Sequence, residues 1–191
     1  MLTKSCTGQA GERGVRATMD IQTYSADKAR EVAELFHQSI HAIDPSLYTS
    51  EQKEAWAPTP VDYENWSERL KAKKPFIALI ENCVAGFIEL DANGHIDCTY
   101  THPNFQGRGV ASALYEHLLA EARARNLKRL YVEASLIAKP FFEHRGFSVV
   151  KKNEVQRNAV SLVNFSMERY LSPNNQMRRC ASALSVRHFG E

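Results

Sequence analysis

The sequence predicts an α/β (α+β) fold in which a mixed, mainly antiparallel sheet of six or seven strands carries helices on both faces. Two observations predict it. Short apolar runs separated by turn residues indicate a three-stranded meander at 76–80, 84–90 and 95–101. Further along, apolar residues recur at helical spacing after residue 106, and strands and helices then alternate. A chain that begins with several strands and continues with alternating strands and helices is typical of a sheet covered by helices.

Before the meander, the sequence predicts one strand and two helices. The strand covers 21–24, and Ser25 is placed to cap the helix that follows, with Asp27 in its first turn. Pro45 ends that helix. A second helix is expected from about 60 to 74, with Trp66 and Leu70 on one face.

After the meander, the sequence predicts two helices and three strands. The long helix after Gln106 has Val110, Leu114 and Leu118 on its apolar face. The remaining elements are a strand at 130–134, a short helix at 138–144 and strands at 147–151 and 161–168. Gly146 stands just past the short helix, where a glycine commonly ends one.

The length of 191 residues fits one domain, with 43% apolar and 24% charged residues. Its two ends differ from the middle in character. Residues 1–18 are rich in Gly, Thr and charge, and residues 172–191 lack a clear period. We therefore expect a domain over 19–171 between an N-terminal extension and a C-terminal tail.

Composition excludes several classes of function. The net charge of +2 and the lack of a basic block with aromatics argue against a nucleic-acid partner. No apolar stretch approaches the roughly 20 residues that span a membrane. The four cysteines form no CxxC pair, so we expect no metal site, and a reducing cytoplasm is the simplest setting. The sequence leaves a homodimer open.

The segment 99–111 carries the clearest chemical signal. A strand ends there, a short loop turns, and a helix begins with Gly107 and Gly109 at its start. Free backbone N–H groups, the helix dipole and the charge of Arg108 would together bind a phosphate. The segment lacks the Walker GxxxxGK[ST] pattern and a full GxGxxG. A glycine loop that merely permits a tight turn is the alternative.

Two segments carry a recognisable pair of motifs: Gln106-x-x-Gly109-x-Ala111, and 141–147 with the sequence Phe-Phe-Glu-His-Arg-Gly-Phe. The first is similar to the Q/R-x-x-G-x-G/A motif of the GNAT superfamily of acetyltransferases, and the second resembles its aromatic pair followed by Gly-Phe. Ala57-Pro58 after Trp56, and Glu133-Ala134-Ser135 before 139–142, look most like the YafP-like branch of that superfamily. The resemblance extends from about Ile21 to Tyr170 and implies a strongly splayed sheet.

The resemblance implies acetyl-CoA as co-substrate, with its pantetheine arm between 99–101 and 131–135. Backbone groups of Thr99 and Thr101 would bind the pantetheine amides, and the Thr101 N–H would polarise the thioester carbonyl. The cofactor-binding residues so implied are Thr99, Thr101, Gln106, Gly107, Arg108, Gly109, Val110, Ala111, Ser135, Phe141 and Phe142. Ser135 stands where many members have Asn.

Direct attack by an amine requires a general base, because an alkylammonium has a pKa near ~10. Asp97 and Glu89 are the expected candidates, and Glu133 is a third. Many family members use a Tyr at the second position of the aromatic pair as general acid, whereas this chain has Phe142 there. Tyr100 or Tyr131 would replace it, or the thiolate leaves unassisted.

The acceptor is expected to be the primary amine of a small molecule or a peptide. Aromatic and histidine residues gather in the first two helices and their connection, and His41 and Trp56 are the candidate acceptor-binding residues. A catalytically weak, CoA-binding regulatory module is the alternative. An acetyltransferase acting on aminoacyl-tRNA is less favoured, because the charge is nearly neutral.

Overall fold

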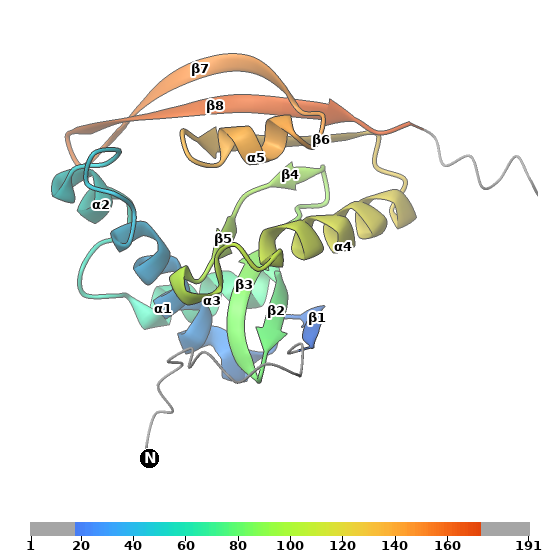
Figure 1. Ribbon diagram of the computed structural model, residues 1–191, viewed down its shortest axis with the longest axis horizontal. Helices are drawn as coiled ribbons and strands as arrows, with labels where there is room; N and C mark the ends of the chain where they lie inside the picture. The colour runs from blue at the N-terminus through green and yellow to red at the C-terminus, as the bar shows by residue number, and fades with distance from the viewer. Residues whose placement is uncertain (1–17, 173–191) are drawn as a thin grey trace, which may run out of the picture.

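The computed structural model describes residues 18–172, and they form two four-stranded sheets that diverge from each other (Figure 1). The first sheet has the order β1-β2-β3-β5 and is antiparallel throughout. Its strands are β1 Met19–Thr23, β2 Phe76–Ile80, β3 Cys83–Ile88 and β5 Thr99–Thr101. The second has the order β4-β6-β8-β7. Its strands are β4 His95–Ile96, β6 Arg129–Ser135, β7 Ser148–Arg157 and β8 Val160–Tyr170.

Helices cover both faces of the first sheet, as the sequence predicts. The α-helices are α1 Ala29–His41, α2 Ser50–Trp56, α3 Tyr63–Lys73, α4 Val110–Ala124 and α5 Lys139–Glu143, and two 3-10 turns cover Ala26–Lys28 and Pro103–Phe105. Along β2, Ile77 joins a core with α1 and α3, whereas Ala78 joins a core with α4. This alternation follows from the two-residue period of a strand.

The predicted strand at 95–101 is in fact two strands, which is why the described chain has eight strands rather than six or seven. His95 and Ile96 pair in parallel with β6, while Thr99–Thr101 pair antiparallel with β3. Asp97 and Cys98 lie between the two pairings. The chain therefore leaves one sheet and enters the other within a few residues. This point, from which β5 and β6 diverge, is called the splay below.

Several other elements differ from the prediction. The helix α2 was not predicted, and its start has a capping box formed by Thr49 and Gln52. The helix expected from about 60 begins at Tyr63, because the side chain of Asp62 caps it by accepting the Asn65 N–H. The last two strands are longer than predicted and form one extended hairpin, β7–β8.

The predicted boundaries of the extension and the tail stay predictions, because residues 1–17 and 173–191 lie outside the described part of the chain. Among residues 18–172, no helix has the length and apolar character that crossing a bilayer would require.

Candidate active site

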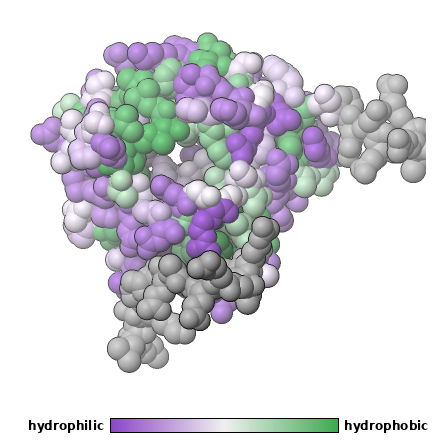
Figure 2. Space-filling view, in the orientation of Figure 1, coloured by the Kyte–Doolittle hydropathy of each residue, from purple (hydrophilic) through white to green (hydrophobic). Residues whose placement is uncertain are grey.

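A cavity of about 720 Å³ lies where the two sheets diverge. The surface is hollowed on the face shown in Figure 2. One wall comes from α1, α2, α3 and the connection between the last two, and the other from β6 and β8. Residues of the splay itself, Ile96–Tyr100, form its floor. The cavity thus joins the predicted acceptor region to the predicted pantetheine cleft.

The backbone of β5 offers free hydrogen-bonding groups to this opening. Glu89 N–H donates to the Cys98 carbonyl and His102 N–H donates to the Ala85 carbonyl, so the even-numbered residues of β5 face β3. Alternate residues of a strand direct their backbone groups to opposite sides. Thr99 and Thr101 therefore direct theirs away from β3, toward the splay. An extended ligand can hydrogen-bond there as an added strand would.

The glycine loop, residues 106–111, follows β5 directly and opens α4. Gly107 and Gly109 have φ of +72° and +80°, a conformation that glycine adopts without strain. A Cβ at either glycine would meet nothing within 4 Å, so the space above the loop is open. Among residues 18–172, no backbone carbonyl accepts a hydrogen bond from the N–H groups of 107–112. N–H groups at a helix start that the backbone leaves unpaired are suited to an anion.

The side chains of the loop differ in what they can do. Gln106 and Arg108 are exposed, and the Arg108 guanidinium lies 5.2 Å from the centre of the Phe105 ring. Val110 is buried in the core, so only its backbone N–H faces outward. The loop is not part of the cavity wall, since it lies past the far end of β5.

Gly86 on β3 positions this loop, and the sequence analysis did not single it out. A Cβ at Gly86 would lie 2.7 Å from Val110 Cγ1 and 2.9 Å from the Tyr100 carbonyl oxygen. The missing side chain lets the first turn of α4 press against β3 and β5. An isolated glycine inside a strand pattern was the available signal.

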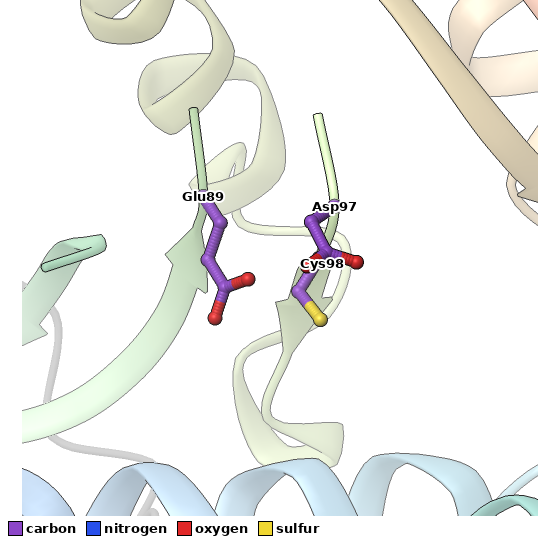
Figure 3. Close-up of side chains that lie close together, drawn as sticks. All are labelled: Glu89, Asp97 and Cys98. Carbon is purple, nitrogen blue, oxygen red and sulfur yellow. The ribbon is translucent and has the colours of Figure 1, made fainter. Parts of the chain in front are cut away.

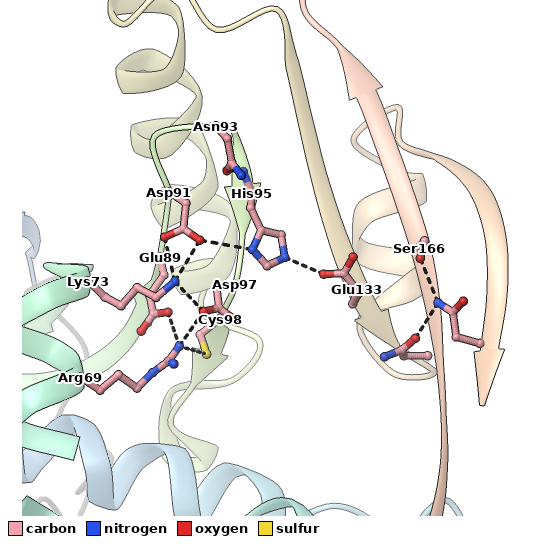
Figure 4. Close-up of polar contacts among 12 residues, drawn as sticks. Arg69, Lys73, Glu89, Asp91, Asn93, His95, Asp97, Cys98, Glu133 and Ser166 are labelled. Atoms are coloured by element: carbon pink, nitrogen blue, oxygen red, sulfur yellow. Dashed lines mark hydrogen bonds and ion pairs between the residues drawn. The ribbon is translucent and has the colours of Figure 1, made fainter. Parts of the chain in front are cut away.

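A network of charged side chains runs from the first sheet across the splay to the second (Figure 4). Arg69 on α3 donates to Glu89 at 2.5 Å and to Asp97 at 2.9 Å. One helical turn later, Lys73 lies 2.9 Å from Asp97 and 2.8 Å from Asp91. Neither cation was predicted as a site residue, although their i, i+4 spacing places them on one face of the helix.

The network continues through His95 to the second sheet. His95 Nδ1 lies 3.3 Å from Asp91 Oδ2, and its Nε2 lies 2.6 Å from Glu133 Oε2 on β6. The His95 ring also stacks on Tyr131, with centroids 4.9 Å apart. These contacts hold β4 and β6 together at the closed end of the splay.

Glu89, Asp97 and Cys98 lie close together (Figure 3). The Glu89 side chain is fully buried and does not line the cavity. Burial raises the pKa of Glu89, although Arg69 acts in the opposite direction. Arg69 also contacts the Cys98 sulfur at 3.4 Å, so one guanidinium holds all three side chains.

Asp97 differs from Glu89 because it lines the cavity. Burial alone would raise the pKa of Asp97, but hydrogen bonds and charge from Lys73 and Arg69 outweigh it, and the pKa lies below its ordinary value. Asp97 is therefore an ionised carboxylate at neutral pH. Glu133 lines the cavity too, with His95 as its partner.

The candidate proton donors occupy different positions. The Tyr100 ring packs against Phe36 and Phe87, and the residue lines the cavity. Burial raises the pKa of Tyr100 well above its ordinary value, while Trp56 and Arg157 act in the opposite direction. Tyr131 does not line the cavity. A phenol with a raised pKa gives up its proton less readily, so Tyr100 is a weak acid here.

Ser135 and Phe142 both line the cavity, whereas Phe141 does not. Phe142 is fully buried, with the ring centroids of Phe141 and Phe147 at 5.3 Å and 5.1 Å. The Ser135 hydroxyl accepts the Ala138 N–H at 3.2 Å and so fixes the turn before α5.

We expect Phe142→Tyr to preserve the fold and not to reduce turnover. The added hydroxyl has the cavity beside it, so it need not be buried without a partner, a state that would cost roughly 1–3 kcal/mol. Circular dichroism and steady-state rates with the same amine check this. A collapse of activity in a folded variant would mean that the cavity requires an apolar ring at 142.

The two residues predicted to bind the acceptor, Trp56 and His41, occupy different places in the structure. Trp56 lines the cavity. His41 does not, because its Nε2 lies 2.8 Å from the Ala57 carbonyl oxygen and its ring stacks on His37 with centroids 4.1 Å apart. His41 thus supports the wall from behind. His37, Tyr48 and Trp66 line the cavity as well.

Comparisons with known proteins agree with this geometry. The model of a family described as an acetyltransferase (GNAT) domain matches residues 45–169. An uncharacterized N-acetyltransferase of Escherichia coli K12, YafP, is 31% identical over 149 residues, which are 78% of this chain and 94% of YafP. The chain therefore belongs to the GNAT family of acetyltransferases.

Solved structures show the same fold. A GCN5-related N-acetyltransferase from Rhodopseudomonas palustris superposes with a TM-score of 0.76 at 33% identity, over 84% of this chain and all of that one. YncA, a putative acetyltransferase from Salmonella typhimurium solved with acetyl-CoA, gives 0.63 at 18% identity, over 83% and 99% of the two chains. At that lower identity the likeness concerns the fold alone.

Proposed function

We propose that this protein transfers an acetyl group from acetyl-CoA to a primary amine of a small molecule or a peptide. The observation that carries the proposal is that two sets of outward-facing backbone groups follow each other directly along the chain. The outward edge of β5, at Thr99 and Thr101, leads directly into the glycine loop, whose N–H groups no backbone carbonyl of residues 18–172 accepts. A ligand with an amide-bearing arm and a pyrophosphate matches that sequence of donors.

Each end of acetyl-CoA has residues that fit it. The backbone N–H groups of 107–112 and the side chains of Gln106 and Arg108 would hold the pyrophosphate. Thr99 and Thr101 would bind the pantetheine amides, and the Thr101 N–H would polarise the thioester carbonyl, which stabilises charge that develops on its oxygen. Bound acetyl-CoA supplies the activated acetyl group.

Asp97 would orient the acceptor amine and accept its proton through a water molecule. The carboxylate lines the cavity and is ionised, and its two cationic partners fix its position. Its lowered pKa makes it a weak base, so the proton would pass on to solvent at the mouth of the cavity. Glu89 supports this arrangement from behind by holding Arg69.

In the transfer, the amine nitrogen forms a bond to the acetyl carbon and the carbon–sulfur bond breaks. The electron pair of that bond stays on sulfur. A phenylalanine at 142 cannot protonate the sulfur, and Tyr100 is a poor donor. Thiols have a pKa only slightly above neutrality, so departure as a thiolate that solvent protonates is consistent with this site.

A CoA-binding module without turnover is the second candidate, because position 142 has no hydroxyl. Release of free CoA thiol, followed with a thiol reagent over a panel of primary amines, distinguishes the two. We expect amine-dependent release. Tight acetyl-CoA binding without release for any amine would favour the module.

A further inference from the structure

One arginine beside the start of α4 has no carboxylate that balances its charge. Arg145 follows α5, and its Nη2 donates to the hydroxyl of Ser112, in the first turn of α4, at 2.7 Å. Arg145 is half-buried, and no residue of 18–172 forms an ion pair with it. Burial lowers the pKa of Arg145, while Tyr115 and Glu116 act in the opposite direction. The fold thus holds a partly desolvated cation at this helix start.

The guanidinium of Arg145 is held in one place by its neighbours. Its central carbon lies 3.5 Å from the centre of the Phe141 ring and 5.2 Å from that of Tyr115. Its Nη1 donates to the Phe141 carbonyl at 3.0 Å. A guanidinium has five N–H donors, so the bonds to Phe141 and Ser112 leave further donors unused, and the one at Nε is buried without a partner among the described residues. An anionic ligand atom would offset the cost of this charge.

The cation lies at the end of the segment that is suited to an anion. Ser112 supplies the last of the backbone N–H groups that no backbone carbonyl of residues 18–172 accepts. Arg108 lies within the same segment, is exposed and forms no ion pair with a described residue. The carboxylate of Glu143, on α5, is already engaged by Lys139 at 2.6 Å. Two positive charges therefore lie beside the row of N–H groups, which favours a ligand with more than one phosphate.

The order of these groups along the chain matches the order of groups in CoA. Thr99 and Thr101 on β5 come first, the glycine loop 106–111 follows, and Ser112 with Arg145 comes last. In CoA, the pantetheine arm leads to the pyrophosphate, and the ribose with its 3′-phosphate follows. A cation beyond the loop is therefore placed for the phosphate beyond the pyrophosphate.

We propose that Arg145 binds the 3′-phosphate of CoA and makes the protein select CoA over 3′-dephospho-CoA. This inference rests on the proposed function and assigns the residue that reads this part of the cofactor. The planar guanidinium can receive two phosphate oxygens at once. Ser112 is a positioning residue, because its hydroxyl holds Nη2 at the start of α4.

The test is calorimetric titration of CoA and of 3′-dephospho-CoA into the full chain. We expect the wild type to bind CoA about 10-fold more tightly, as one charge-assisted hydrogen-bonded contact allows. Arg145→Met should weaken CoA binding to the level of 3′-dephospho-CoA and leave the latter within about twofold. The thioether can pack on Phe141 in place of the guanidinium, so the variant should fold, which circular dichroism checks.

Two further variants refine the role of the side chain. Arg145→Lys keeps the charge but loses the planar fork, so it should retain only part of the preference for CoA. Ser112→Ala removes the group that holds Nη2 and should also reduce the preference partially.

Arg123→Met is the matched control, because it removes the same charge from the other end of α4. Arg123 is exposed in the last turn of that helix. At 1.5 Å per residue it lies about 16 Å from Ser112 along the helix axis. That distance exceeds the Debye length of about 8 Å at physiological ionic strength. Its preference for CoA should equal that of the wild type.

The outcomes separate this inference from the proposed function. Equal affinities of the wild type for the two ligands would overturn the inference and leave CoA as the cofactor. An equal loss for both ligands in Arg145→Met would overturn it too, because that is the result of a contact to the pyrophosphate or of a purely structural role. No binding of either ligand by the folded wild type would overturn the proposed cofactor as well.

Discussion

Replacing Asp97 by Asn should lower kcat by about 10- to 100-fold, with a much smaller change in KM for acetyl-CoA. A positioned proton acceptor with a pKa near the working pH contributes about 10²- to 10⁴-fold, and the lowered pKa of Asp97 places it at or below the lower end of that range. The substitution is nearly isosteric and leaves each cation with a carboxylate, since Arg69 keeps Glu89 and Lys73 keeps Asp91. Steady-state kinetics with one amine at saturating acetyl-CoA measures the effect.

Asp91→Asn is the matched control. Asp91 shares Lys73 with Asp97 but does not line the cavity. Its replacement should change kcat by less than about threefold if Asp97 acts on the amine directly. Equal losses in both variants would mean that the network, and not the Asp97 carboxylate, sustains turnover.

The pH profile gives an independent check of the same role. Because the pKa of Asp97 lies below its ordinary value, the carboxylate stays ionised between pH 5 and 8. The rate between pH 5 and 8 should therefore rise with the fraction of deprotonated amine and show no step from Asp97. A step that disappears in Asp97→Asn would contradict the lowered pKa.

Replacing Arg69 by Met should destabilise the fold by about 3–5 kcal/mol, because it leaves the fully buried Glu89 carboxylate without its cation. Chemical denaturation followed by circular dichroism measures the free energy of unfolding. Lys73→Met is the matched control on the same helix. Its partners Asp91 and Asp97 are 29% and 30% exposed, so we expect a loss of only about 1 kcal/mol.

A second substitution and a change of pH identify Glu89 as the cause. Adding Glu89→Gln to Arg69→Met should recover much of the lost stability, since a neutral amide is less costly to bury than a carboxylate. Without Arg69, the already raised pKa of Glu89 should rise further. A folded state that binds this proton more tightly than the unfolded state gains stability as the pH falls, so the deficit should shrink from pH 8 to pH 5. A deficit independent of pH would contradict this explanation.

Much of the fold and the position of the glycine loop could be predicted from the sequence, because both depend on local patterns. The hairpin of β2 and β3 follows from two apolar runs separated by the turn residues Glu81 and Asn82. The start of α4 follows from glycines between a strand and an apolar helical stripe. Gly107 and Gly109 indeed adopt the positive φ that their position implies.

The aromatic residues of the first helices could be expected on the acceptor side, and Trp56 does line the cavity. The rest of that side could not be predicted, because it depends on contacts between segments far apart in sequence. The division of 95–101 into two strands depends on β3 and β6 as separate partners, and residues 95–101 alone read as one strand. In the sequence, Arg69 is an ordinary polar position of a helix. Only the fold places Glu89 and Asp97 opposite it. In the sequence, Arg157 is an ordinary residue before a turn. Only the fold shows that the β7–β8 hairpin brings it to the cavity. Local periodicity contains none of this information.

The most direct test of the central claim is calorimetric titration of acetyl-CoA into the wild type, Gly109→Asp and Gly109→Asn. Both substituents tolerate the positive φ of residue 109 and meet no protein atom there, so both variants should fold. They differ in charge, and only Asp would repel a pyrophosphate at the free N–H groups of α4. We predict micromolar binding by the wild type, a loss of about 30-fold or more in Gly109→Asp, and a clearly smaller loss in Gly109→Asn. No binding by the folded wild type, or equal affinities for all three proteins, would contradict the assignment of this loop to the cofactor.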